Sequence, residues 1–170
     1  MNHKSINTNY DRLEVHFQKI NDLRHVSAIA GWDEASMMPT GGGEARAQAM
    51  STLDVMIHQL VTEPKVGEWI DGAKAGSSLD DWQAANLREI DRTWQEATCM
   101  PEDLVAANSI ARSKCEQAWR LHRGNNDWKS MEPLLAEVVS LTREEASCRS
   151  ESTGLGLYDA MLNLYEPDVT

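Results

Sequence analysis

The sequence lacks the patterns by which common catalytic sites are recognised. Its 170 residues include one Phe and three Cys, and no two Cys form a Cys-x-x-Cys pair. There is no Gly-x-Ser-x-Gly nucleophile turn, no His-Glu-x-x-His zinc helix, and no His/Glu cluster with metal-ligand spacing. From its chemistry alone, the chain is predicted to carry no catalytic and no metal-binding residue.

Positive charge is also scarce, with 16 Lys and Arg against 27 Asp and Glu and a net charge of −11. That balance argues against a nucleic-acid partner and against binding to anionic membranes. No stretch approaches the roughly 20 apolar residues that a spanning helix needs, and the polar start is not a secretory signal. The Cys are odd in number and widely spaced, which favours free thiols in a reducing compartment. We therefore expect a cytoplasmic protein with no membrane partner.

Apolar residues recur at steps of three and four along most of the chain, which is the period of an amphipathic helix. These stripes predict helices over Asn9 to about Ser36, Gly43 to Leu60, a short stretch after Pro64, Leu79 to Ala97, Pro101 to about Leu121, a stretch after Asp127, and a last one around Tyr158. No segment of the sequence shows a convincing β-strand pattern. The prediction is an all-α fold of six or seven helices in an antiparallel bundle, with 1–8 as a disordered start and 9–170 as one helical region.

The helix ends are predicted from capping residues, Gly and Pro. Asn9 is the expected N-cap of the first helix, Ser78 is expected to open a capping box, and Gly124 is expected to be a left-handed C-cap. The run Gly41–Gly43 is expected to use positive φ angles at a sharp corner. Pro133 is expected in the first turn of its helix, where it is tolerated.

That corner joins the first two predicted helices. Trp32 is expected to pack inside it, and Arg46 is placed to pair with Asp33 or Glu34. The glycine run is not a phosphate loop, because no strand precedes it and no Gly-Lys-Ser/Thr follows. Asp33, Glu44 and Arg46 are interpreted as structural residues, and whether they contact a substrate stays open.

The histidines are interpreted as structural. His16 and His25 are nine residues apart, a spacing that does not bring them to one metal ion, and each is expected at the surface or its boundary. His58 is followed by Gln rather than Glu. His122 lies near the C-terminal end of a predicted helix, where positive charge is favoured.

Trp and Glu residues are interpreted in the same way. Trp82 and Trp94 share one helix face and are expected in the core, although a ligand pocket lined by these residues and Trp32 is an alternative. Glu144 and Glu145 are expected on the solvent side of their helix. Because neighbouring helical residues point in different directions, they are not an acid/base pair.

Several short segments, spread in order over most of the chain, match a known family. They are Gly31-Trp32-Asp33, Met38 to Ala47 with Thr52-Leu53, Met100-Pro101 with Leu104-Val105, Asn126-Asp127-Trp128 with Pro133 and Leu135, Tyr158-Asp159-Ala160 with Leu162, and Leu164 to Pro167. Together they resemble the N-terminal region of the carboxypeptidase Taq family. Its members are zinc metallocarboxypeptidases that remove C-terminal residues from peptides.

The resemblance implies a largely helical enzyme, typically a homodimer, with two lobes around a deep substrate groove. Its zinc site, a His-Glu-x-x-His helix with a downstream Glu, lies beyond the region matched here. No catalytic or metal residue can therefore be carried over to this chain, and its substrate-binding residues are unknown. Zinc and a peptide substrate are expected for the full enzyme.

For the chain itself, the resemblance implies helices that wall or cover the groove and pack on the rest of the polypeptide. An apolar helix stops shortly before Thr170. We therefore expect that this sequence was cut from within a longer protein. We expect this chain alone to bind no zinc and to be inactive. The alternative is a free-standing, non-catalytic helical interaction module.

Overall fold

The chain is described by a computed structural model that covers residues 8–76 and 79–167. Over these residues it forms seven α-helices, one short 3-10 helix and no strand, so the all-α prediction is confirmed. The elements are α1 (Asn9–Ser36), η1 (Thr40–Gly42), α2 (Gly43–Val61), α3 (Pro64–Ala75), α4 (Asp81–Thr98), α5 (Glu102–Gly124), α6 (Trp128–Thr153) and α7 (Leu157–Leu162). Across the described part, no helix is both long and apolar enough to cross a membrane.

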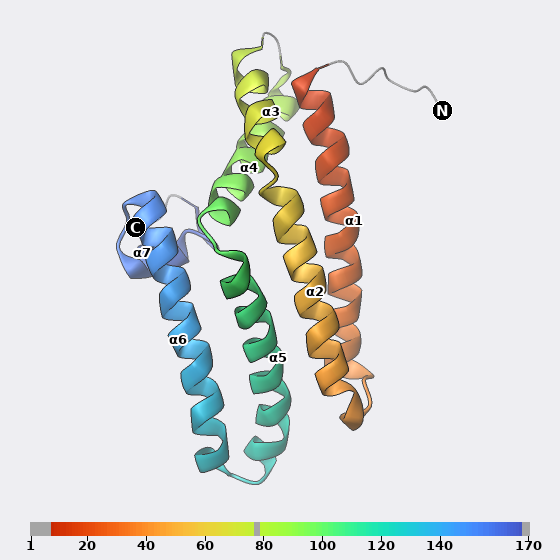
Figure 1. Cartoon of the computed structure of the whole chain (residues 1–170), viewed down its shortest axis with the longest axis vertical. Coiled ribbons are helices and arrows are strands. Elements are labelled where there is room, and N and C mark those ends of the chain that lie inside the picture. The colour runs from red at the N-terminus through yellow and green to blue at the C-terminus, as the bar shows by residue number, and fades with distance from the viewer. Residues whose placement is uncertain (1–7, 77–78, 168–170) are drawn as a thin grey trace.

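The long helices pair as antiparallel neighbours. Figure 1 shows α1 and α2 as one hairpin and α5 and α6 as another, and α2 packs against α5 between them. Helices α3 and α4 pack on the end of α1, and α7 packs on α6. This arrangement leaves α1 and α6 on opposite sides of the molecule (Figure 1).

The apolar core lies where α1, the end of α2, α3 and α4 meet. Its buried members are Tyr10, Leu13, Phe17, Ile20, Val61, Val66, Ile70, Ala73, Leu87 and Ile90. His16 lies beside this core and is also buried, with its Nε2 atom 2.7 Å from the carbonyl oxygen of Leu60. The prediction of a surface or boundary histidine was therefore wrong, because a backbone carbonyl supplies the polar partner that burial requires.

Helix α1 begins one residue earlier than its predicted cap implied. Thr8, not Asn9, is the N-cap, and its hydroxyl and the Asp11 carboxylate form a reciprocal capping box. Asn9 instead packs against Gly72 of α3, where any Cβ atom would collide with the Asn9 amide. Of the predicted disordered start, residues 1–7 lie outside the described residues.

Two further caps differ from the predictions. The N-cap of α4 is Asp80, whose side chain accepts from the backbone N–H of Gln83, and Ser78 lies outside the described residues. Gly124 is the last residue of α5 rather than a left-handed cap, and the positive φ of 53° falls on Asn126. Asn tolerates this conformation better than most residues, so it can take the position predicted for Gly.

The glycine corner turns without positive φ. Gly41 and Gly42 belong to η1, and Gly43 has a φ of −60° at the start of α2. Among the described glycines, Gly154 has the positive φ, at 74°. Gly43 is needed for a different reason, because a Cβ atom there would collide with the side chain of Gln117 from α5. It therefore permits the close approach of α2 and α5.

Pro133 and two Trp residues also depart from expectation. Asp127 caps α6, so the helix starts at Trp128 and Pro133 lies beyond its first turn, where it removes a backbone hydrogen bond.

Trp32 is 63% exposed and Trp82 is 86% exposed, although both were predicted inside. Trp32 lies in the last turns of α1, and Trp82 lies in the first turn of α4. Trp94 does pack against the core, as predicted.

Candidate functional site

An open cavity of about 480 Å³ lies between α1, α2, α4, α5 and α6. Its lining is unusually rich in charged side chains, namely Arg24, Glu34, Asp54, Glu96, Arg112, Glu116, Glu145 and Arg149. Apolar side chains such as Met50 and Ile57 line it as well. A cavity with this lining can hold a polar or charged ligand by hydrogen bonds and ion pairs.

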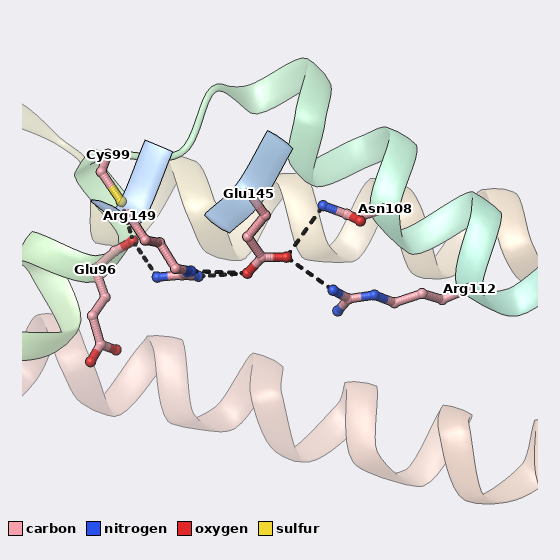
Figure 2. A network of polar contacts seen from close by, with 6 residues as sticks. All are labelled: Glu96, Cys99, Asn108, Arg112, Glu145 and Arg149. Atoms are coloured by element: carbon pink, nitrogen blue, oxygen red, sulfur yellow. Dashed lines mark hydrogen bonds and ion pairs between the residues drawn. The ribbon is translucent and has the colours of Figure 1, made fainter. Parts of the chain in front are cut away.

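The buried carboxylate of Glu145 lies at the centre of the charged lining (Figure 2). One oxygen accepts two hydrogen bonds from the guanidinium of Arg149, from Nε at 3.0 Å and from an Nη atom at 2.9 Å, so both bonds converge on a single carboxylate oxygen. The other oxygen accepts from Arg112 at 2.9 Å and, at 3.5 Å, from the amide of Asn108. Glu145 is only 6% exposed, and two guanidinium groups compensate for the loss of water around its charge.

The sequence-based placement of Glu145 on the solvent side was therefore wrong. Glu145 and Ala146 are both buried where α6 packs on α5, while Glu144 is exposed. The spacing of four residues between Glu145 and Arg149 is a signal for an ion pair on one helix face. That signal alone does not show burial, because exposed pairs have the same spacing.

Near Glu34, which also lines the cavity, polar contacts join α1 to α5. The Glu34 carboxylate accepts from the hydroxyl of Ser113 and, at 3.0 Å, from the amide of Gln117. Arg120 donates to the backbone carbonyls of Glu34 and Ala35, at 3.1 and 3.2 Å. These bonds fix the last turn of α1 on α5.

Asp33, Glu44 and Arg46 lie outside this cavity. Arg46 pairs with Asp33 at 2.5 Å and also donates to the carbonyl of Ala30. The expected ion pair at the corner is thus confirmed for Asp33, and Glu34 points to α5 instead. The pair links α1 to α2, which is a structural role, and Glu44 lines a separate small hollow beside Gln117.

Two cationic groups of the cavity are affected by burial. Loss of water lowers the pKa of Arg24, and the nearby carboxylate of Glu96 partly opposes this. Loss of water likewise lowers the pKa of His58, against the opposing effects of Glu102 and the backbone of Met100. Within the described residues, the side chain of Arg24 makes no hydrogen bond, so its guanidinium donors are available to a ligand in the cavity.

Asn108 carries a buried polar atom that has no partner in the described part of the chain. Its side chain is 6% exposed, and its Oδ1 atom is buried without a hydrogen-bond partner among the described residues. Buried amide oxygens normally have a partner. Sequence reasoning missed this residue's role, because Asn108 gave only the signal of an inward-facing helix position.

The residues that the structure describes are not arranged as a zinc site. In the described ranges there is no group of three or more His, Cys, Asp and Glu residues placed to hold a metal ion. His16 contacts a backbone carbonyl and His122 lies 3.4 Å from Asp127, so these two imidazoles do not meet. The most buried carboxylate of the cavity, Glu145, is surrounded by guanidinium groups, which repel a metal cation.

Comparisons with known proteins give a consistent family. A sequence model described as "Carboxypeptidase Taq (M32) metallopeptidase" matches residues 12–170. Thermostable carboxypeptidase 1 of Thermus thermophilus is 33% identical over 155 residues, a match that covers 85% of this chain and 30% of that protein. Carboxypeptidase 1 of Bacillus subtilis is 25% identical, over 90% of this chain and 30% of that protein.

Solved structures agree with the sequence matches. Metallocarboxypeptidase 1 of Trypanosoma cruzi superposes with a TM-score of 0.77 at 35% identity, covering 95% of this chain and 32% of that one. The helices therefore have the arrangement of the N-terminal helical part of these enzymes. The chain spans about 30% of the length of the curated relatives that it matches.

Proposed function

Because the chain belongs to the carboxypeptidase Taq (M32) metallopeptidase family, we propose that it forms the N-terminal helical portion of an enzyme that hydrolyses C-terminal residues from peptides. In this proposal its helices wall the substrate groove. The hydrolytic site, and the zinc ion that activates water there, belong to the remainder of the polypeptide.

The observation that carries this proposal is the family match over residues 12–170, combined with an open polar cavity in the same helices. A groove for peptides needs donors and acceptors that are not already used within the fold. Arg24 supplies free guanidinium donors on the lining of the cavity. The paired cluster around Glu145 keeps neighbouring side chains in fixed positions, which favours ordered binding.

The remaining partners follow from the same proposal. The rest of the polypeptide would cover apolar side chains that are exposed here, including Trp32, Met37 and Trp128. Peptides are the substrates, and assembly as a homodimer in the cytoplasm is proposed for the complete enzyme. The three free Cys agree with a reducing compartment.

A chimeric enzyme tests the proposal. This chain would replace the matching segment of the Thermus thermophilus carboxypeptidase, and release of a C-terminal amino acid from a short peptide would be measured. We expect release by the chimera and none by this chain alone. Release by this chain alone would contradict the proposal, whereas a well-folded chimera without activity would favour the non-catalytic interaction module.

The groove role has a separate test within an active chimera. Arg24→Gln removes cavity donors without removing any hydrogen bond between described residues, so KM is expected to rise about fivefold to tenfold. Arg88→Gln is the matched control, because the exposed Arg88 has no side-chain hydrogen bond or ion pair among the described residues and does not line this cavity. Equal effects of the two substitutions on KM would contradict a groove role for Arg24.

A further inference from the structure

Two of the three thiols lie on one open surface hollow, a cavity of about 790 Å³ where α4 turns into α5. Cys99 is the C-cap of α4 and Cys148 belongs to α6, and both line this cavity together with Thr98, Pro101 and Ser152. Both thiols are free and half-buried. The third thiol, Cys115, is buried in α5 and does not line the cavity.

The position of Cys99 is fixed by the polar contacts shown in Figure 2. Its Sγ atom donates to the backbone carbonyl of Glu96 at 3.2 Å, and Arg149 donates to the same carbonyl at 3.2 Å. Cys148 precedes Arg149 in the chain. It follows Glu145 by three residues, so it lies on the face of α6 that turns toward α4 and α5.

We propose that Cys99 and Cys148 form a reversible intramolecular disulfide, which makes this cavity a redox modification site. The oxidant is a low-molecular-weight disulfide. One protein thiolate attacks a sulfur of that disulfide, its S–S bond breaks, and one small thiol leaves. The second protein thiolate then attacks the protein sulfur of the mixed disulfide, the Cys99–Cys148 bond forms, and the second small thiol leaves.

The electrons and protons of this exchange balance. The two protein thiols together lose two protons and two electrons, and the small disulfide takes them up to become two small thiols.

Burial raises the pKa of the Cys99 thiol, and the nearby Arg149 guanidinium partly opposes that effect. Because the thiolate is the nucleophile, oxidation is expected to be faster in mildly alkaline solution than at neutral pH.

The bond would act on the wall of the polar cavity. Glu96, whose carbonyl accepts from both Cys99 and Arg149, lines that polar cavity, and so does Arg149. A Cys99–Cys148 bond would tie α4 to α6 and close a loop that contains α5. Closing such a loop restricts the unfolded chain, so oxidation should raise the midpoint of thermal unfolding.

Mass spectrometry after treatment with oxidised glutathione tests the proposal. Trypsin places the three Cys on separate peptides, since Cys99 lies between Arg92 and Arg112, Cys148 follows Arg143, and Cys115 follows Lys114. The expected product is the Cys99 peptide joined to the Cys148 peptide, with the mass of two hydrogen atoms lost. The oxidised monomer should unfold roughly 5 °C higher than the reduced one, and dithiothreitol should reverse the change.

Variants and gels separate the other outcomes. Cys115→Ser is the matched control and should form the bond normally, whereas Cys99→Ser and Cys148→Ser should stop at a mixed disulfide on the remaining thiol. Circular dichroism would confirm that each variant is helical. Glutathione attached to both wild-type thiols without a joined peptide would overturn the proposal, and so would joined peptides found only in dimers on a non-reducing gel.

Discussion

The end of the molecule where α1, α3 and α4 meet is held by apolar side chains, whereas the cavity between α2, α5 and α6 is bordered by charged ones. In the first region, Leu13 and Val66 are fully buried and Ile70 nearly so. In the second region, the central buried side chain is a carboxylate, Glu145, between Arg112 and Arg149. Both regions are built from packed α-helices, so they differ in their side chains and not in their secondary structure.

The difference shows how stability and binding are divided within this helical unit. Burying one large apolar side chain contributes about 1.5–3 kcal/mol, and no specific partner is required. A buried ion pair contributes little net stability, because the loss of water offsets the attraction, but it holds its side chains in defined positions. The apolar end therefore stabilises the fold, and the charged cavity is the part suited to recognise a ligand.

The strongest test of the apolar end is Leu13→Ala. Leu13 is 0% exposed, so its truncation leaves a cavity, and the free energy of unfolding should fall by about 4 kcal/mol. Val15→Ala on the same helix is the control, because Val15 is 44% exposed and its loss should cost less than about 1 kcal/mol. Chemical denaturation would measure both. Similar losses would show that the apolar end is not the main source of stability.

The charged cavity is tested by a pair of neighbouring substitutions. Glu145→Gln leaves the buried guanidinium of Arg149 without its ionic partner, so we expect a loss of about 2 kcal/mol in the free energy of unfolding. Glu144→Gln alters an exposed carboxylate one residue away and should change it by less than about 0.5 kcal/mol. If the two losses are equal, Glu145 does not have the buried role described above.

The smallest expected effect is the pH dependence that His58 confers. Its pKa is lowered in the folded protein, so the unfolded chain binds the proton first as the solution becomes acidic. Stability from this group is therefore complete above the unfolded pKa of about 6.5 and falls as pH decreases from there toward the folded pKa. His58→Gln should flatten this part of the stability curve in urea titrations at several pH values. Identical slopes for both proteins would contradict the shift.

Much of the helical framework could be predicted from local patterns. The start of α2 at Gly43 and a short helix after Pro64 were confirmed. In α5, Leu104, Ala111 and Cys115 are buried at the helical spacing of steps of seven and four. These features depend on periodicity, Pro and Gly, which act within one or two helical turns.

The errors arose where a long-range neighbour decides the outcome. Trp32 and Trp82 have apolar side chains at suitable positions, but no other helix covers them. Glu145 and His16 looked like solvent-facing residues, yet each finds a partner from elsewhere in the fold, Arg112 from α5 and the carbonyl of Leu60 from α2. Such partners are separated by tens of residues, so local periodicity cannot reveal them.

The sequence by itself determined that this protein is helical, where most of its helices lie and, through matching segments, which family it resembles. Only the tertiary structure decided which charges are buried and where the polar cavity lies. It also decided that Cys99 and Cys148 line one cavity. The physical reason is that helix formation follows from short-range spacing, whereas burial and pairing depend on which helix faces meet.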